Sequence, residues 1–173
     1  MDFGKLHLYT GNGKGKTTAA FGLAVRASGH GYRTYIGQFL KNQIYGEVKA
    51  LKNNPMITVE LFGAGDCIAQ RDITDEDYRH AKIGLEKCEM ALHSSSYHIV
   101  VMDEICIAIN KGLLKETDVL KVILNRPHDT ELILTGRYAP KSFMRHADLI
   151  TEMQATKHYY NTEGLISRKG IEC

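Results

Sequence analysis

The amino-acid sequence predicts an α/β fold with a mostly parallel central sheet, and two observations support this. Short apolar segments typical of strands alternate with longer segments of helical periodicity along the chain. Such alternation implies right-handed crossovers between parallel strands. In addition, the first apolar segment is followed by a glycine- and lysine-rich stretch, 9–18, that leads directly into the first helical one. Because parallel sheets bind ligands beyond the carboxyl ends of their strands, the same pattern predicts where a site lies.

Three strands are expected in the first third of the chain. Small residues in the first predicted helix let it lie close to the sheet, and Gly29 and Gly31 end it. Pro55 separates a short helix from the third strand, which is rich in apolar and β-branched residues. The predicted elements are a strand around Leu6 and Leu8, a helix over 17–30, a strand over 33–40, a helix over 46–52 and a strand over 57–62.

The remainder of the chain continues the alternation. Thr74 precedes three acidic residues and predicts the cap of a long helix. Its buried stripe is predicted to be Tyr78, Ala81, Leu85, Cys88 and Leu92. The elements expected after it are a buried strand over 98–104, a short helix closed by Gly112, a helix over 117–125, a strand over 130–135, a helix ending at His146 and a strand over 149–153, whereas 157–173 is polar with few signals.

The glycine-rich stretch has the chemistry of a phosphate-binding loop. Its glycines let backbone N–H groups point into one concavity, the following helix presents the positive end of its dipole, and Lys16 adds a point charge. Thr17 places a hydroxyl where a phosphate-bound Mg²⁺ is held. Thr10 stands where the usual spacing has its first glycine, so the loop is a variant. The residues predicted to bind the nucleotide are Gly11, Asn12, Gly13, Lys14, Gly15, Lys16, Thr17 and Thr18.

Two more polar clusters follow predicted strands. Asp103 and Glu104 come after four apolar residues, a pattern in which an acid holds Mg²⁺ directly or through water. Arg137 follows the next strand, where a guanidinium is suited to stabilising charge on a leaving group. With the loop, these residues predict the P-loop NTPase (RecA-like) three-layer fold, with a sheet of about six strands. They predict Mg²⁺–ATP binding, but they do not decide which bond is broken.

Composition limits the partners and the cellular setting. The 173 residues suit one domain spanning 1–173, and a formal charge of +2 is too balanced to indicate nucleic acid or an anionic membrane. Four scattered cysteines indicate reduced thiols rather than a disulfide framework or a zinc site. No run reaches the roughly 18 apolar residues of a membrane span, so a soluble, cytoplasmic protein is expected.

The assembled motifs resemble those of the ATP-dependent corrinoid adenosyltransferases, and the resemblance covers nearly the whole chain. It includes the variant loop with its threonine at position 10. The other matching segments are Gly29-His30-Gly31, Gln38-Phe39-Leu40-Lys41, Val100-Val101-Met102-Asp103-Glu104, Asn125-Arg126-Pro127, Thr135-Gly136-Arg137, Ala147-Asp148-Leu149-Ile150-Thr151-Glu152-Met153, Lys157-His158 and Lys169-Gly170-Ile171-Glu172.

The resemblance implies a substitution at carbon, in which Co(I) of a corrinoid attacks C5′ of ATP and inorganic triphosphate leaves. It also implies that the nucleotide lies in the opposite direction along the loop from that in other phosphate-loop proteins. On this basis the catalytic residues are Lys16, Asp103, Glu104 and Arg137, and the ligands of Mg²⁺ or Mn²⁺ are Thr17 with Asp103 or Glu104. The implied partners are the corrinoid substrate, an electron-donating flavoprotein reductase and a second copy of the chain in a homodimer.

One region departs from the family pattern. Some members use a Phe and a Trp after the third strand to displace the lower axial ligand of cobalamin, but this chain has no Trp. Phe62 and Ile68 are the candidates for contact with the corrinoid ring in this region. The motifs leave two alternatives open. One is a P-loop ATPase or small-molecule kinase that transfers a phosphoryl group, and the other is a nucleotide-gated binding module without turnover.

Overall fold

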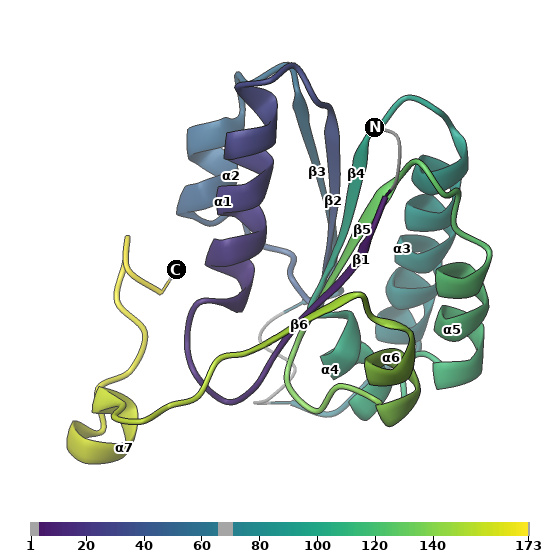
Figure 1. Ribbon diagram of the computed structural model, residues 1–173. Helices are drawn as coiled ribbons and strands as arrows, with labels where there is room; N and C mark the ends of the chain where they lie inside the picture. The colour runs from purple at the N-terminus through teal and green to yellow at the C-terminus, as the bar shows by residue number, and fades with distance from the viewer. Residues whose placement is uncertain (1–3, 66–70, 173) are drawn as a thin grey trace.

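Six short apolar segments form one sheet in the computed structural model, which describes residues 4–65 and 71–172. The strands are β1 (Leu6–Thr10), β2 (Thr34–Phe39), β3 (Ile57–Phe62), β4 (Ile99–Asp103), β5 (Glu131–Thr135) and β6 (Leu149–Glu152). They pair in the order β3-β2-β4-β5-β1-β6, and every pair is parallel (Figure 1). This confirms the predicted α/β class and its P-loop NTPase-like fold.

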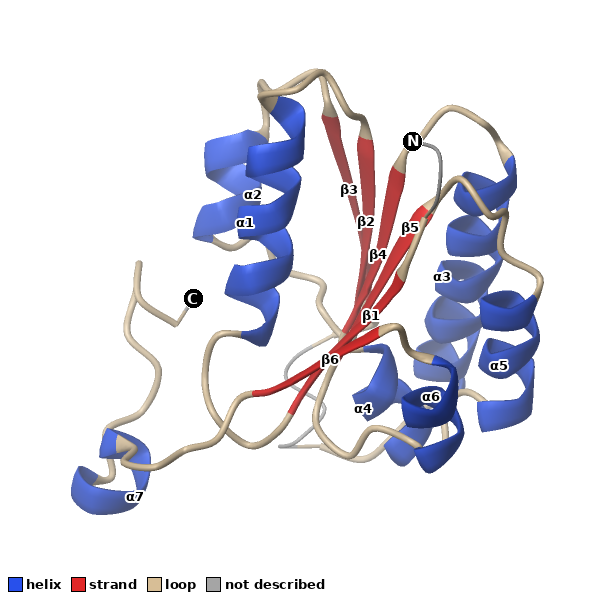
Figure 2. Ribbon diagram, in the orientation of Figure 1, coloured by secondary structure: helices blue, strands red, loops and turns tan. Residues whose placement is uncertain are grey.

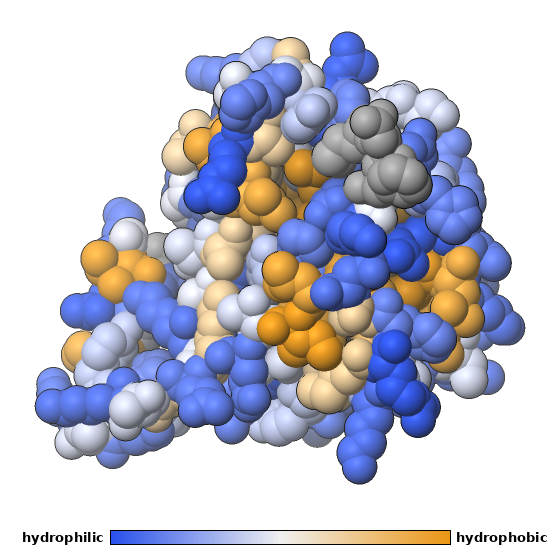
Figure 3. Space-filling view, viewed as in Figure 1, coloured by the Kyte–Doolittle hydropathy of each residue, from blue (hydrophilic) through white to orange (hydrophobic). Residues whose placement is uncertain are grey.

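Helices cover both faces of the sheet. The helices are α1 (Lys16–Ser28), α2 (Gly46–Leu51), α3 (Asp75–His93), α4 (Ile105–Asn110), α5 (Glu116–Leu124), α6 (Lys141–His146) and α7 (Tyr159–Glu163). Helices α1 and α2 lie on one face, and α3 to α6 lie on the other (Figure 2). Helix α7 belongs to neither layer. It lies in the carboxyl-terminal segment, which projects from the body of the protein as a largely hydrophilic extension at the lower left of the space-filling view (Figure 3).

Alternate residues of each central strand enter opposite halves of the core. Val100 and Met102 pack with the helices on the α3 side, whereas Ile99 and Val101 pack with α1 on the other side. Ala20 and Ala24, two of the small residues of α1, are fully buried against the sheet. A sheet buried on both faces requires apolar residues at consecutive positions. This is why the central strands β4 and β5 contain continuous apolar runs.

The cysteines described by the structure are part of this core. Cys88 and Cys106 are both buried and free, and burial raises the pKa of the Cys106 thiol to about 12. Cys67 and Cys173 lie outside the described residues. Within 4–65 and 71–172, no helix is both long and apolar enough to cross a membrane.

One helix was not predicted, and one expectation about a helix was wrong. Helix α7 lies in the segment 157–173, which gave few sequence signals. Tyr78, predicted to belong to the buried stripe of α3, is 46% exposed, and the neighbouring Asp77 is only 4% exposed. Asp77 turns inward because its carboxylate accepts hydrogen bonds from both terminal nitrogens of Arg71, each at 2.6 Å, and from the N–H and hydroxyl of Thr74.

This buried carboxylate predicts an acid-sensitive element of stability. The Arg71 guanidinium holds the pKa of Asp77 well below its usual range. Because the folded-state pKa is the lower one, Asp77 stabilises the fold at any pH above its unfolded pKa of about 3.9. That contribution is lost as the pH falls through the folded pKa. We expect Asp77→Asn to lower the free energy of unfolding by about 2 kcal/mol at neutral pH, measured by urea denaturation, and to remove this acid dependence.

Asp75→Asn is the matched control, because Asp75 is exposed in the same first turn of α3. Its effect is expected to stay within about 1 kcal/mol, the range of a charge near a helix end. Equal losses in both variants would show that the charge at the helix end, and not the Arg71 pair, stabilises this region.

Candidate active site

The loop between β1 and α1 wraps around the ammonium group of Lys16. Gly11 and Gly15 adopt left-handed backbone conformations, with φ of 94° and 115°, which favour glycine. Lys16 is 6% exposed, and its Nζ donates to the carbonyl oxygens of Gly11 at 2.8 Å and Gly13 at 2.7 Å. Burial lowers the pKa of this lysine. The loop therefore holds a cation that is poorly solvated, as a site for an anionic ligand requires.

The same loop packs against the chain that leaves β6. The Gly13 N–H donates to the Met153 carbonyl at 2.6 Å, and the Met153 N–H donates to the Thr10 carbonyl at 2.9 Å. A Cβ on Gly13 would lie 2.6 Å from that Met153 oxygen, so only glycine permits this approach. The sequence assigned the N–H groups of Gly11 to Gly15 to a triphosphate. The structure instead engages the Gly13 N–H with Met153.

The Asp103 carboxylate accepts hydrogen bonds from four side chains. It is fully buried at the end of β4, and its Oδ1 accepts from Thr17 at 2.9 Å and Thr135 at 2.8 Å. Its Oδ2 accepts from the amide of Gln38 at 2.9 Å and from the ammonium of Lys41 at 3.2 Å. A carboxylate bonded by four donors has a fixed orientation, and here Oδ1 is fixed toward the start of α1.

Strand order explains this meeting. Strand β5 lies between β1 and β4, so the Thr135 hydroxyl at its end stands between the loop and Asp103. Strand β2 flanks β4 on the other side and brings Gln38 and Lys41. All three residues stand in segments that match the family, but none of them was predicted to belong to the site. The signal that was available is polarity, because Gln38 and Thr135 are fully buried polar residues in apolar strands.

Two non-glycine residues beside Asp103 have left-handed backbones. Leu40, after β2, has φ of 63°, and Glu104, after β4, has φ of 62°. Such conformations cost of order 1–3 kcal/mol each and persist where surrounding structure enforces them. Gly63 permits the turn at Leu40, because a Cβ there would lie 2.7 Å from backbone atoms of Lys41. The loops after β2 and β3 are thus in close contact at this turn.

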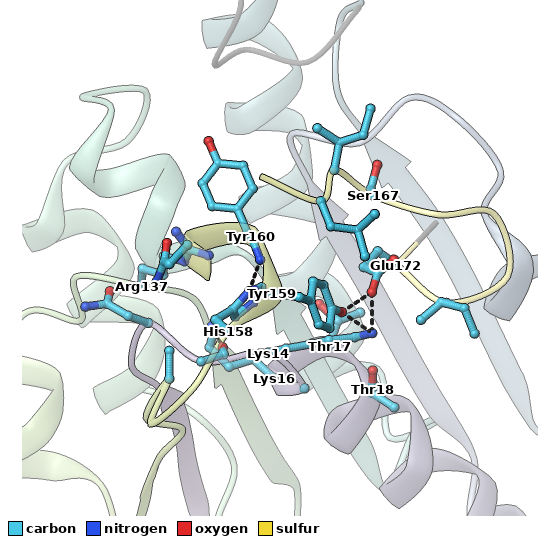
Figure 4. A pocket seen from close by; sticks show the side chains of 18 of the residues that line it. Lys14, Lys16, Thr17, Thr18, Arg137, His158, Tyr159, Tyr160, Ser167 and Glu172 are labelled. Atoms are coloured by element: carbon cyan, nitrogen blue, oxygen red, sulfur yellow. Dashed lines mark hydrogen bonds and ion pairs between the residues drawn. The ribbon is translucent and has the colours of Figure 1, made fainter. Parts of the chain in front are cut away.

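A pocket of about 750 Å³ opens over the loop. The pocket is lined by Lys16, Thr17, Glu104 and Arg137, so three of the four predicted catalytic residues and the predicted metal ligand Thr17 meet around it. The fourth predicted catalytic residue, Asp103, lies behind Thr17 and does not line the pocket. Burial, with the nearby charge of Asp103, raises the pKa of Glu104. The nucleotide residues Asn12, Gly13, Lys14, Gly15 and Thr18 line the same pocket (Figure 4).

The carboxyl-terminal segment forms the outer wall of this pocket, which the sequence did not reveal. Lys14 Nζ lies 2.8 Å from a carboxylate oxygen of Glu172 and 3.3 Å from the hydroxyl of Tyr159. Tyr159 also donates to Glu172, and the Arg168 guanidinium lies over the Tyr159 ring, 4.9 Å from its centroid. Figure 4 shows the Lys14, Tyr159 and Glu172 contacts as dashed lines, on the opposite side of the pocket from Arg137.

Phe62, a predicted corrinoid contact, does not line this pocket. It is 5% exposed, and its ring centroid lies 5.9 Å from that of Phe39. Its contact with a corrinoid stays a prediction. Ile68, the other predicted contact, lies outside the described residues.

Oxygen donors around Thr17 fit a phosphate-bound Mg²⁺ or Mn²⁺ better than an ion held by protein alone. Thr17 and Glu104 line the pocket, and Asp103 bonds Thr17 from behind. Among the described residues, no group of three or more His, Cys, Asp or Glu side chains is arranged to hold a metal. This fits Mg²⁺, which usually keeps several waters and takes its remaining ligands from one or two carboxylates and substrate phosphates.

Comparisons with known proteins agree with this geometry. The model of the family described as ATP:corrinoid adenosyltransferase BtuR/CobO/CobP matches residues 2–173. The corrinoid adenosyltransferase of Pseudomonas aeruginosa is 33% identical over 171 residues, which cover 98% of this chain and 83% of that protein. The corrinoid adenosyltransferase of Escherichia coli K12 is 30% identical, with coverage of 98% and 85%. The corrinoid adenosyltransferase CobA of Salmonella typhimurium is 28% identical, also with coverage of 98% and 85%.

Proposed function

The chain belongs to the ATP:corrinoid adenosyltransferase family, and from this premise we propose how its residues divide the work of adenosyl transfer. The enzyme transfers the 5′-deoxyadenosyl group of ATP to Co(I) of a corrinoid, in cobalamin biosynthesis. The observation that supports the assignment of the site is the meeting of Lys16, Thr17, Glu104 and Arg137 around one pocket. We assign this pocket to ATP.

The reaction requires little acid-base catalysis from the protein. The cobalt electron pair attacks C5′, a Co–C bond forms, and the C5′–O bond breaks with its electrons going to the departing triphosphate. No proton is removed from the nucleophile, so the protein's tasks are to position ATP and to neutralise the leaving group. Lys16 and Arg137 supply positive charge to the triphosphate, and the N–H groups of the loop other than that of Gly13 orient it.

A divalent ion adds charge neutralisation on the triphosphate when it is bound. We propose that Thr17 and Glu104 hold Mg²⁺ or Mn²⁺ together with phosphate oxygens and water. Asp103 acts through the Thr17 hydroxyl, since both of its oxygens accept bonds from protein donors. The support for this proposal is that the oxygen atoms of Thr17 and Glu104 lie around the pocket at the N-terminal end of α1.

The organisation of the whole chain is also proposed here. One sheet containing every described strand supports the proposal that 1–173 forms a single nucleotide-binding domain. The family resemblance supports a homodimer and an electron-donating flavoprotein reductase as partners. The cytoplasmic location stays a prediction of the sequence.

The alternative, phosphoryl transfer by an ATPase or small-molecule kinase, is not favoured, because the family and the named corrinoid adenosyltransferases match nearly the full chain. The two reactions leave different products from ATP. Adenosyl transfer breaks the bond at the ribose carbon and leaves triphosphate intact, whereas phosphoryl transfer yields ADP.

The test is incubation of the protein with ATP, Mg²⁺ and a chemically reduced corrinoid under anaerobic conditions. We expect a light-sensitive Co–C product by absorbance and an equal amount of intact triphosphate by ion chromatography. Running complete and incomplete corrinoids in parallel shows which of them the enzyme prefers. Formation of ADP or orthophosphate without alkylcobalt absorbance would overturn adenosyl transfer in favour of the alternative.

A further inference from the structure

We propose that Lys41 is a positioning residue for the metal–triphosphate site, acting through Asp103. Its ammonium fixes Oδ2 of this carboxylate, so that Oδ1 stays directed at the Thr17 hydroxyl. This role rests on the proposed function, in which Thr17 binds the ion that accompanies ATP. It assigns a task to a lysine that is not in the phosphate loop and does not line the pocket.

The contacts of Lys41 show where its charge is used. Its Nζ lies 3.2 Å from Asp103 Oδ2, 3.7 Å from a carboxylate oxygen of Glu47 and 5.5 Å from the centroid of the Tyr45 ring. The Asp103 side chain is fully buried, whereas that of Glu47 is 29% exposed. Since an ion pair with a buried group is screened less by water, Asp103 is the dominant partner.

The side-chain amide of Gln38 is a second donor to Oδ2 of Asp103. Gln38 is fully buried and donates to Oδ2 at 2.9 Å, and its own Oε1 has no hydrogen-bond partner within the described residues. Flipping the Gln38 amide would not solve this, because its Oε1 would then face Oδ2 of Asp103 and the hydrogen bond between them would be lost. A buried acceptor without a partner is costly and calls for an explanation. Here the amide and Lys41 together hold one carboxylate oxygen in place.

The backbone that delivers Lys41 is strained. Strand β2 ends at Phe39, and the left-handed Leu40 turns the chain so that the next side chain returns to Asp103. Gly63 makes room for this turn, because a Cβ there would strike the backbone of both Leu40 and Lys41. Strain of this kind clusters where a side chain must be placed for function. The turn therefore supports a functional use of Lys41 rather than an incidental surface ion pair.

The test measures ATP affinity by calorimetry twice for each variant, once with excess Mg²⁺ and once with EDTA. Partners in the outer shell of a metal site typically change metal affinity by 10- to 100-fold. We therefore expect Lys41→Met to reduce the gain in ATP affinity caused by Mg²⁺ by at least about tenfold, while the affinity in EDTA is unchanged. Lys41→Arg should restore part of the gain, because its guanidinium can also reach a carboxylate oxygen.

Lys49→Met is the matched control, since Lys49 is an exposed lysine of α2 and is not one of the four donors to Asp103, and it should leave both affinities unchanged. An unaltered Mg²⁺ gain in Lys41→Met would overturn the proposal. So would an equal loss with Mg²⁺ and with EDTA, which would indicate direct phosphate binding or general damage. A wild-type protein whose ATP affinity ignores Mg²⁺ would instead overturn the metal site itself. Thermal melting of each variant shows whether it is folded, and Lys41→Gln replaces the methionine variant if that one is not.

Discussion

Lys16→Ala is expected to lower kcat/KM for ATP in corrinoid adenosylation by a factor between about a hundred and a thousand. Lys16 is the buried cation at the centre of the phosphate loop, held by the carbonyl oxygens of Gly11 and Gly13. In the proposed mechanism it exchanges these carbonyls for the leaving triphosphate, on which negative charge develops. Losing one preorganised charge at the leaving group removes stabilisation that water cannot replace. The measurement is the initial rate of alkylcobalt formation from a chemically reduced corrinoid.

Lys111→Ala provides the control for the loss of a lysine. Lys111 is exposed at the end of α4, does not line the pocket and should leave the rate unchanged. A Lys16→Ala enzyme with near wild-type kcat/KM would show that the triphosphate is not bound by this loop. A change confined to KM, with kcat intact, would show that Lys16 binds ATP and its transition state equally.

Asp103→Asn is expected to weaken metal-dependent activity by at least about tenfold, or 1.4 kcal/mol in the barrier. The reason is specific to the four donors on this carboxylate. An asparagine retains one oxygen and places an NH₂ group against donors that had bonded the other. Either Thr17 loses its acceptor or Lys41 is left without its buried partner. We expect a loss of about 3 kcal/mol in the free energy of unfolding as well.

Both effects are measured on the same preparation, by the cobalt absorbance assay at several Mg²⁺ concentrations and by urea denaturation. Asp129→Asn is the control, because Asp129 is an exposed aspartate in the turn before β5. Unchanged activity in Asp103→Asn would remove this residue from the site. A loss of stability with full activity would assign Asp103 to the fold alone.

Much of this protein was predictable because its strongest signals are local. The small residues of α1, the capping Thr74 and the apolar runs of β4 and β5 each depend on neighbours within one element, so their periodicity reports structure directly. Most predicted elements begin and end within two residues of the structure. The positions of the loop at 11–18 and of the two acids at the end of β4 were also predictable, because the fold class places the carboxyl ends of the strands at one edge of the sheet.

The direction of a single side chain is harder to predict from the sequence. The structure places Phe62, a predicted corrinoid contact, beside Phe39 and Gly84. Tyr78 has the right spacing for a buried stripe, but the Arg71 pair draws Asp77 inward in its place. These side-chain directions depend on contacts with other parts of the chain, and the spacing of apolar residues within one helix or strand carries no information about those contacts.

The sequence by itself determined the fold class, the phosphate loop and the carboxylate that the loop needs, because each is encoded by neighbouring residues. Only the tertiary structure decided that Thr135, Gln38 and Lys41 converge on Asp103, that Gly13 bonds Met153, and that Glu172 reaches Lys14. The partners in these contacts are separated by as few as 32 residues and as many as 158. Their meeting depends on strand order and register, which a single sequence does not display through local periodicity. The loop is therefore predictable from the sequence, whereas the network that orients the Thr17 hydroxyl depends on the folded sheet.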